Sequence, residues 1–226
     1  MTAVEMQIKF EQLLKTHDIK DLNILDITSN VSYFLTESQR KIVEYYYDIF
    51  ETNEKAKKVL APLVLNVNLT RISVNSSQTG VHPNGEYWRL PNNLMYVIKE
   101  EATLSVDSCG TTTSVEADRF RSWVKPVNID YYNTHKDSPF KKPYTALTWR
   151  LDITSASNKI HELITGGARI EKYHLTYLKY PTPISIEEEE DSILPELIHQ
   201  DIVTGAVKMA LEVLYNNINL NRKQNG

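Results

Sequence analysis

The chain has 226 residues, of which 41% are hydrophobic and 24% charged, and it carries a net charge of −4. This composition is typical of a globular protein with a sizeable core, and the negative charge argues against a dedicated nucleic-acid-binding protein. Cys109 is the one cysteine, so an internal disulfide is excluded. No apolar run approaches the roughly 18 residues of a membrane span, and the N-terminus lacks a signal-peptide pattern. We therefore expect a soluble protein that is not exported and does not contact a membrane.

Two helices are predicted before residue 62. Thr2 and Glu5 form a capping box for the first helix, and an apolar stripe follows at Met6, Phe10, Leu13 and Leu14. Thr36 and Gln39 form a second capping box. The apolar stripe of this second helix consists of Ile42, Val43, Tyr46, Tyr47 and Phe50. Residues 53–62 either extend this second helix or form a short one, which Pro62 ends.

After Pro62 the apolar period changes from that of a helix to that of a strand. We predict a strand from 63 to 70, a turn at 81–88, and a short helix at 127–135. Further strands are predicted at 94–106, 111–126, 145–153, 159–165 and 168–180, which gives a block of about six strands.

A last helix follows a proline-containing acidic connector at 180–192. We expect it to begin at Pro195 and to be frayed over the polar tail 216–226. Gly205 and Ala206 leave room for a close neighbouring helix. The predicted stripe is Leu197, Ile198, Ile202, Ala206, Met209, Ala210 and Val213.

The order of elements predicts an α+β protein. Amphipathic helices at both ends of the chain need partners, so we expect residues 1–61 and 192–226 to form one small helical bundle. Residues 62–191 would then be an inserted antiparallel β domain, either a sandwich or barrel-like.

Two Glu-x-x-His pairs raise the alternative of a small metal-dependent enzyme, because di-iron bundles use this spacing on helices. Glu171 and His174, however, lie on a predicted strand, where residues three apart point to opposite faces. Glu196 falls in the first turn of the last helix, where acids favour the helix dipole, and His199 lies off its apolar stripe. No nucleophile or phosphate-loop motif occurs, and Cys109 is read as structural. We therefore predict no catalytic residue, metal or cofactor.

Charge is unevenly distributed along the chain. Residues 119–150 hold seven basic side chains (119, 121, 125, 136, 141, 142 and 150) against Asp130 and Asp137, whereas residues 187–201 hold seven acids and no Lys or Arg. Such zones suit subunits that pair side by side, although solvated surface explains them equally well.

Four stretches, in order along the chain, carry a family resemblance. They are "MTAVEMQIKFEQLL", "SNVSYFLTESQRKIVEYYYDIFE", "VKPVNIDYYNTHKDSPFKKPYTALTWRLDI" and "YLKYPTPI" with "LPELIHQDIVTGAVKMALE". Together they resemble the head–tail connector (ring or adaptor) proteins of tailed bacteriophages, particularly crAss-like and other short-tailed phages. The loop "THDIKDLNILDITSN" departs from the glycine-containing spacer of those proteins.

The resemblance implies a virion structural protein and no enzymatic activity. It implies a homo-oligomeric ring of about twelve copies, assembled in the host cytoplasm, that joins the portal to the tail and adjacent ring proteins at the head–tail interface. DNA would pass through the ring without specific binding. A different tail-side or capsid-associated structural ring is the alternative.

Five residues are the predicted contacts with a partner: Phe140, Lys141, Lys142, Pro143 and Trp149. Trp149 alternates with Leu147 and Leu151, so it fits the core equally well. We further hypothesise that the basic 119–150 zone of one subunit faces the acidic 187–201 zone of the next, in which case charge reversal at Lys141 and Lys142 weakens assembly.

Overall fold

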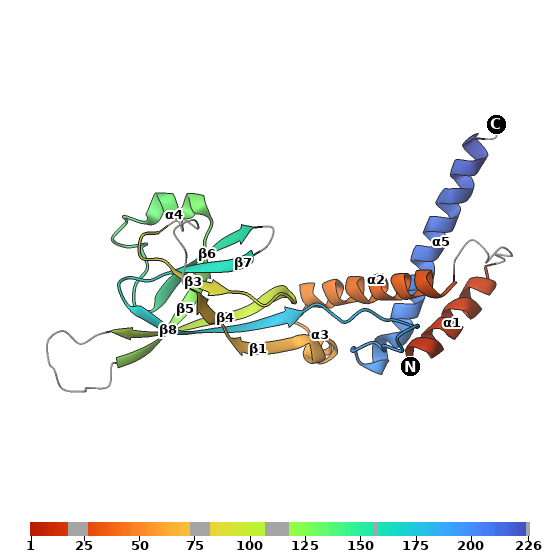
Figure 1. The fold of residues 1–226 in the computed structure, drawn as a ribbon, viewed down its shortest axis with the longest axis horizontal. Coiled ribbons are helices and arrows are strands. Elements are labelled where there is room, and N and C mark those ends of the chain that lie inside the picture. The colour runs from red at the N-terminus through yellow and green to blue at the C-terminus, as the bar shows by residue number, and fades with distance from the viewer. Residues whose placement is uncertain (18–26, 73–81, 107–117, 156–157, 225–226) are drawn as a thin grey trace. The chain divides into compact units, whose positions relative to one another are not determined.

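The computed structural model describes residues 1–17, 27–72, 82–106, 118–155 and 158–224. The chain divides into two compact units, Met1–Val64 with Tyr180–Gly226, and Leu65–Lys179. The first unit is helical and the second holds the sheet (Figure 1), so the predicted α+β class, helices plus a barrel-like β block, is confirmed. That the chain folds as separate domains divided after residues 61 and 191 stays a prediction.

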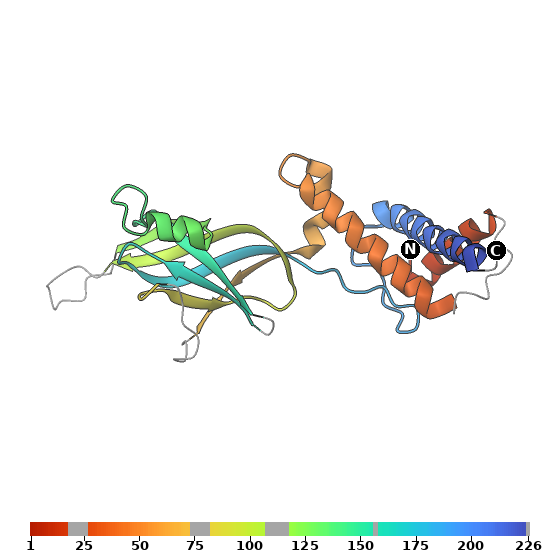
Figure 2. The same cartoon turned by 90° about the horizontal axis from the view of Figure 1, so that it is seen from above.

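The helical unit is built around its last helix. Helix α5 packs against both α1 and α2, and Figure 2 shows these helices from above. The elements are α1 (Ala3–Lys15), α2 (Ile27–Asp48), α3 (Glu54–Leu60) and α5 (His199–Gln224), with 3₁₀ turns at Ala61–Leu63 and Glu196–Ile198.

Helix α1 starts as its sequence predicts. The Thr2 hydroxyl accepts a hydrogen bond from the Glu5 amide at 3.2 Å, and the Glu5 carboxylate accepts one from the Thr2 amide at 2.9 Å. This capping box satisfies amides that lack a partner within the helix. Met6, Phe10 and Leu14 are then buried on one face, and each such burial stabilises the fold by about 1.5–3 kcal/mol.

The second predicted capping box is wrong. Helix α2 already begins at Ile27, so Thr36 and Gln39 lie in its middle, where backbone amides have partners within the helix. Both side chains instead hydrogen-bond the 180–192 connector. The short helix that was one of two alternatives for residues 53–62 is α3, with Asn53 as its N-cap.

Helix α5 differs from its prediction at both ends. Pro195 precedes a 3₁₀ turn, and the α-helix begins at His199. The α-helix continues to Gln224, through most of the polar tail that was expected to be frayed. Between Gly205 and Gly226 the sequence has neither proline nor glycine to end it.

The buried face of α5 is also turned relative to the predicted stripe. Leu197 and Val213 are 69% and 44% exposed, while Val203, Val207 and Leu214 are buried. The reason is that α5 contacts two helices, which widens its apolar face. The close approach predicted at Gly205 is confirmed, since a Cβ atom there would lie 2.4 Å from Ser38 Oγ.

The second unit is one eight-stranded sheet in the order β1-β8-β4-β5-β6-β7-β3-β2. The two strands at its ends, β1 and β2, are neighbours in sequence and are separated only by Leu69. The Leu69 amide donates to the Tyr173 carbonyl at 2.9 Å, so the chain runs from one edge of the sheet to the other and nearly closes it. The strands are β1 (Val64–Asn68), β2 (Thr70–Ile72), β3 (Glu86–Arg89), β4 (Leu94–Val106), β5 (Asp118–Pro126), β6 (Leu147–Ser155), β7 (Asn158–Ile164) and β8 (Arg169–Lys179).

The sheet is mixed, whereas the sequence predicted it to be antiparallel. Strands β5 and β6 pair in parallel. A parallel pair needs a crossover connection, and the segment that carries helix α4 (Ile129–His135) provides it. Two short strands were also missed, because Glu86–Arg89 was read as part of a turn and the bend at Leu69 separates β2 from β1.

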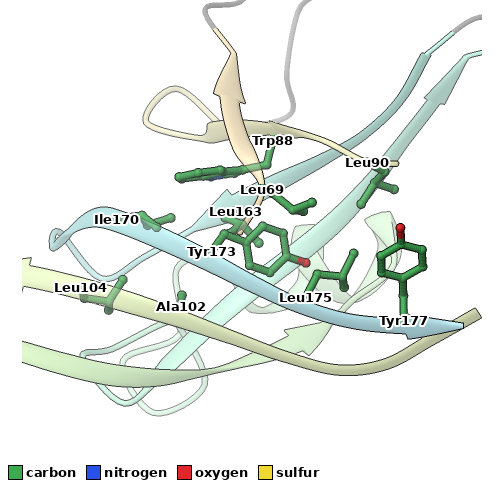
Figure 3. Close-up of a cluster of buried hydrophobic side chains, with 10 residues drawn as sticks. All are labelled: Leu69, Trp88, Leu90, Ala102, Leu104, Leu163, Ile170, Tyr173, Leu175 and Tyr177. Carbon is green, nitrogen blue, oxygen red and sulfur yellow. The ribbon is translucent and has the colours of Figure 1, made fainter. Parts of the chain in front are cut away.

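Two apolar clusters stabilise this sheet. The larger fills its interior, where Trp88 of β3, Leu163 of β7, and Tyr173 and Leu175 of β8 come together (Figure 3). The smaller consists of Tyr132, Trp149, Leu151 and Ile164, and it lies on the other side of β6, under α4.

Candidate partner interface

Helix α4 and the loop after it hold four of the five predicted contact residues. Asn128 caps α4 by accepting a hydrogen bond from the Tyr131 amide at 2.7 Å. Tyr131 and Tyr132 then meet the Trp149 ring edge-on, with centroids 5.6 and 6.4 Å away. Trp149 is fully buried, which matches the core alternative and makes it a support of α4.

The loop after α4 exposes a short tip. Phe140 is 93% exposed, and Lys141 and Lys142 are exposed beside it, whereas Pro143 is buried. The Lys142 amide donates to the Ser138 carbonyl at 3.1 Å. The base of the loop is tightly packed, because a Cβ atom on Gly166 would lie 2.5 Å from the Pro143 carbonyl oxygen.

The five predicted residues therefore divide into two groups. Phe140, Lys141 and Lys142 lie at the exposed tip, while Pro143 and Trp149 are buried beneath it. In this structure only the first three can touch a partner.

Sequence reasoning missed a second exposed aromatic residue, Trp123 of β5, which is 79% exposed. Its neighbours Ser122 and Val124 are buried or half-buried, so Trp123 points away from the interior. The sequence "RFRSWVK" contains a sign of this exposure. In it Trp123 shares one face of the predicted strand with the basic residues Arg119, Arg121 and Lys125. The other two tryptophans, Trp88 and Trp149, are buried.

A polar groove of about 420 Å³ runs beside Trp123 on the outer face of the sheet. Lys99 and Glu101, two residues apart on β4, form an ion pair of 2.9 Å in its wall. The hydrogen bond from Lys99 holds the pKa of Glu101 below its ordinary value, although burial opposes the shift. The groove is lined by Asn66, Val67, Asn68, Lys99, Glu101, Arg121, His174, Leu175 and Thr176.

Several basic side chains of the 119–150 zone already have partners within the chain. Arg150 is buried against Glu100 at 2.7 Å, Arg119 pairs with Glu171 at 3.0 Å, and Lys125 donates to the Tyr131 hydroxyl at 3.0 Å. Within the described part of the chain, Arg121, Lys141 and Lys142 have no hydrogen bond or ion pair through their side chains, so their charges are available to a partner.

The acidic connector is a fixed turn. Ser185 and Glu190 exchange two backbone hydrogen bonds of 3.1 and 2.9 Å. On the α2 side, the Ser32 hydroxyl accepts a hydrogen bond from the Ile186 amide at 3.2 Å. The Thr36 hydroxyl accepts one from the Ile184 amide at 3.0 Å.

Gln39 completes this clamp on the connector. Its Nε2 donates to the Thr182 carbonyl at 2.8 Å, and its Oε1 accepts from the Ser192 hydroxyl. Residues 187–191 are exposed at the end of the turn. The Asp191 carboxylate accepts a hydrogen bond from the Ala3 amide at 2.6 Å, so the helical unit presents the four adjacent carboxylates of residues 187–190 from a fixed backbone.

The residues considered for a metal have other partners. Glu171 pairs with Arg119, and His174 lies 3.3 Å from the Thr103 hydroxyl. His199 was expected off the apolar stripe, but it is buried, and its Nε2 donates to the Leu194 carbonyl at 2.7 Å. No group of three His, Cys, Asp or Glu side chains suited to a metal occurs within the described residues. Cys109 lies outside them.

A buried polar network crosses the interior of the sheet. Tyr173 donates to Glu100, and His161 lies 2.8 Å from the Tyr173 hydroxyl and 3.1 Å from Asp152. Burial, and then the Glu100 charge, raise the pKa of Tyr173. The hydrogen bond from His161 lowers the pKa of Asp152. For Arg150, burial alone would lower the pKa, but Glu100 raises it above the ordinary value. These contacts tie β4, β6, β7 and β8 together.

Comparison with known families identifies the class of protein to which the chain belongs. A family model described as "Phage tail ring protein 3/4" matches residues 1–222. The chain belongs to this family. It is also similar to "Ring protein 4/5" of Bacteroides phage crAss001, with 22% identity over 203 residues and 79% of each chain covered. The family likeness predicted from the four stretches is confirmed.

Family membership gives this ring protein a structural role in the phage tail and a place in the virion. It also favours a structural protein over an enzyme. None of the helices in the described ranges is both long and apolar enough to cross a membrane. The exposed loop tip and the outer face of the sheet are therefore candidate surfaces for protein contacts.

Proposed function

We propose that this ring protein forms a closed ring of about twelve copies at the head–tail interface, assembled in the host cytoplasm, where it joins the portal to the tail and continues the DNA channel. The observation that carries the proposal is the family match over residues 1–222, which makes a ring the unit of function. A separate tail-side or capsid-associated ring is the alternative.

The charge of the chain supports passage of DNA without specific binding. Proteins that hold DNA do so mainly through Lys and Arg contacts to phosphates, and the net charge here is −4. A ring of such subunits carries a multiple of this negative charge. DNA can move through it without being held at one position.

The tip at Phe140, Lys141 and Lys142 is the proposed contact with the portal or an adjacent ring. An exposed phenylalanine at 93% accessibility leaves its apolar surface in water, and burial in a partner's pocket recovers that free energy. The flanking lysines add charge that steers association. Pro143 and Trp149 hold the tip in position from below.

Co-assembly with purified neighbours tests this function. The ring protein is mixed separately with portal and with tail-side ring proteins from the same phage, and complexes are separated by size. We expect the wild type to bind the portal. We expect the triple variant Phe140→Ala, Lys141→Glu, Lys142→Glu to remain folded but to form less complex with the portal or with the adjacent ring protein. Binding only to tail-side proteins would favour the alternative ring. Stoichiometric iron or zinc in the purified protein would contradict a purely structural role.

A further inference from the structure

We propose that the outer face of the sheet around Arg121, Trp123 and Lys172 is the docking site for the acidic turn Glu187–Asp191 of a neighbouring copy of the same chain. This inference rests on the proposed ring. It assigns a specific contact between subunits, with one surface in each of the two units of the chain.

Strand register places the basic and aromatic side chains in adjacent rows. Arg121 and Lys172 both lie opposite Thr103, one on each side, in the pairing of β4 with β5 and with β8. In the next row, Trp123 and His174 both lie opposite Glu101. Directly paired residues share a face of the sheet, so all of these side chains lie on the outer face.

The charge of this face is positive and partly uncompensated. Arg121 and Lys172 are exposed and, within the described residues, make no hydrogen bond or ion pair through their side chains. Arg169 lies opposite Ser105 in a third row, where Arg119 is its counterpart across β4. Among the described residues in and between these three rows, Glu101 and Glu171 carry the negative charge, and each already pairs with a basic residue.

Trp123 gives this face the character of a protein-binding surface. An exposed tryptophan leaves a large apolar surface in contact with water, which is unfavourable. Tryptophan and arginine are both enriched among the residues that contribute most binding energy to protein interfaces. The adjacent groove of about 420 Å³ has a polar lining that includes Arg121 and His174. A volume in this range accommodates inserted side chains of a partner.

The acidic turn is the complementary surface that the chain itself supplies. Residues 187–191 are consecutive acids and all are exposed, and the Ser185–Glu190 backbone pair together with the contacts of Ser32, Thr36 and Gln39 fixes the turn. Because the turn is ordered before binding, less conformational entropy is lost on docking. Asp191 is held by the Ala3 amide, and the four carboxylates of residues 187–190, placed opposite a basic face, favour association.

Two different surfaces on one chain produce a head-to-tail contact. Each copy offers its acidic turn to one neighbour and its basic face to the other, so the contact is heterologous, and a closed ring results when the rotation between copies closes. DNA is a less suitable occupant of the basic face, because acids are interleaved among its basic residues and the chain as a whole is negative.

Charge exchange between two variants tests the contact. Variant one carries Arg121→Glu and Lys172→Glu. Variant two carries Glu187→Lys, Glu188→Lys and Glu189→Lys. In either variant alone, like charges meet at every contact, so we expect loss of rings. In an equimolar mixture, opposite charges meet again at every contact, so we expect rings in which the variants alternate. The control Lys41→Glu with Lys208→Glu changes exposed lysines of the helical unit and should keep rings.

Quenching of tryptophan fluorescence by acrylamide, which is neutral and therefore insensitive to the charge changes, gives an independent measurement. Trp88 and Trp149 are buried, so Trp123 is the tryptophan open to solvent. We expect acrylamide to quench each variant alone and to lose most of this effect in wild-type rings and in the mixture. Circular dichroism confirms that both variants are folded.

The outcomes separate this inference from the proposed ring. Rings formed by each variant alone, with Trp123 still quenched, would overturn the docking site and leave the ring intact. Failure of the wild type to form rings, while the mixed variants still associate and protect Trp123, would overturn the ring and keep the contact. DNA binding that disappears with Arg121→Glu and Lys172→Glu, without any effect on rings, would assign the face to nucleic acid instead.

Discussion

At the scale of single residues, the interior of the sheet combines apolar packing with paired charges. Glu100 and Arg150 are 6% and 11% exposed and lie 2.7 Å apart. Two such groups are costly to bury, and their attraction offsets that cost only while both are present. Substitutions on the polar face of β6, at Arg150, should therefore be tolerated as poorly as substitutions on its apolar face, at Trp149.

Removing one partner of this ion pair is expected to destabilise the protein strongly. Glu100→Gln removes the buried counter-charge of Arg150 and leaves it only the half-exposed Asp152, so we expect the free energy of unfolding to fall by about 3 kcal/mol. Urea denaturation measures this change. The double variant Glu100→Leu, Arg150→Met should lose less than Glu100→Gln; an equal or greater loss would show that the charge pair is not the reason.

The lowered pKa of Asp152 predicts a loss of stability in acid. Because the hydrogen bond from His161 and the charge of Arg150 favour its ionised form in the folded state, the stability it contributes is present above the ordinary aspartate pKa of about 3.9. It is lost as the pH falls through the lowered folded value. The melting temperature of Asp152→Asn, measured from pH 6 to pH 3, should fall less steeply than that of the wild type. Parallel curves would refute this role.

At the scale of elements, two sites join α2 to the rest of the helical unit. One is the clamp on the connector by Thr36 and Gln39. The other is the crossing of α2 and α5, where Ser38 donates to the Ile202 carbonyl at 2.7 Å beside Gly205.

Gln39→Leu tests the clamp. The substitution leaves the Thr182 carbonyl and the Ser192 hydroxyl without their partner, and we expect it to cost about 1–3 kcal/mol of unfolding free energy. The connector should also be cut faster by a protease specific for glutamate. Gln7→Leu, which removes a part-buried hydrogen bond within α1, is the matched control. Unchanged cleavage in Gln39→Leu would mean that the clamp does not hold the turn.

The helix crossing predicts energetic coupling between Gly205 and Ser38. Replacing a helical glycine with alanine gains about 1 kcal/mol, but in the wild type the new Cβ atom would lie 2.4 Å from Ser38 Oγ. We expect Gly205→Ala to stabilise the protein when Ser38→Ala is also present and to fail to do so otherwise. Additive effects of the two substitutions on urea denaturation would contradict the close contact.

Local sequence patterns predicted much of this architecture. The capping box at Thr2, the alternation from Leu63 to Leu69 and the short helix after Asn128 are set by nearby residues, and the structure confirms them. Thr36 and Gln39 show the same spacing as a capping box, but what they bind is a segment far along the chain. A pattern of spacing contains no information about that partner.

The candidate surfaces were less predictable, because exposure depends on how the sheet closes. Trp149 and Trp123 both lie on alternating strands, yet α4 covers the first and the second faces solvent. Arg150 belonged to the predicted basic zone, but closure of the sheet places it against Glu100. Whether each of these side chains is exposed or buried depends on the pairing of strands that are far apart in the sequence.

At the scale of the whole molecule, the chain combines a helical unit and a β unit, each with a surface suited to protein contacts. The loop tip at Phe140 and the outer face at Trp123 belong to the β unit, and the acidic turn belongs to the helical unit. A ring subunit needs at least two surfaces for its neighbours. The Phe140 tip leaves a third for another component of the virion.

Negative-stain electron microscopy of the purified protein shows whether it forms a ring. We expect closed rings of uniform size with an open lumen, seen with about twelve-fold symmetry, and we expect the variant Arg121→Glu, Lys172→Glu to lose them. Particles that remain monomeric at high protein concentration and in the presence of portal, or that form open filaments in place of rings, would contradict the proposed ring.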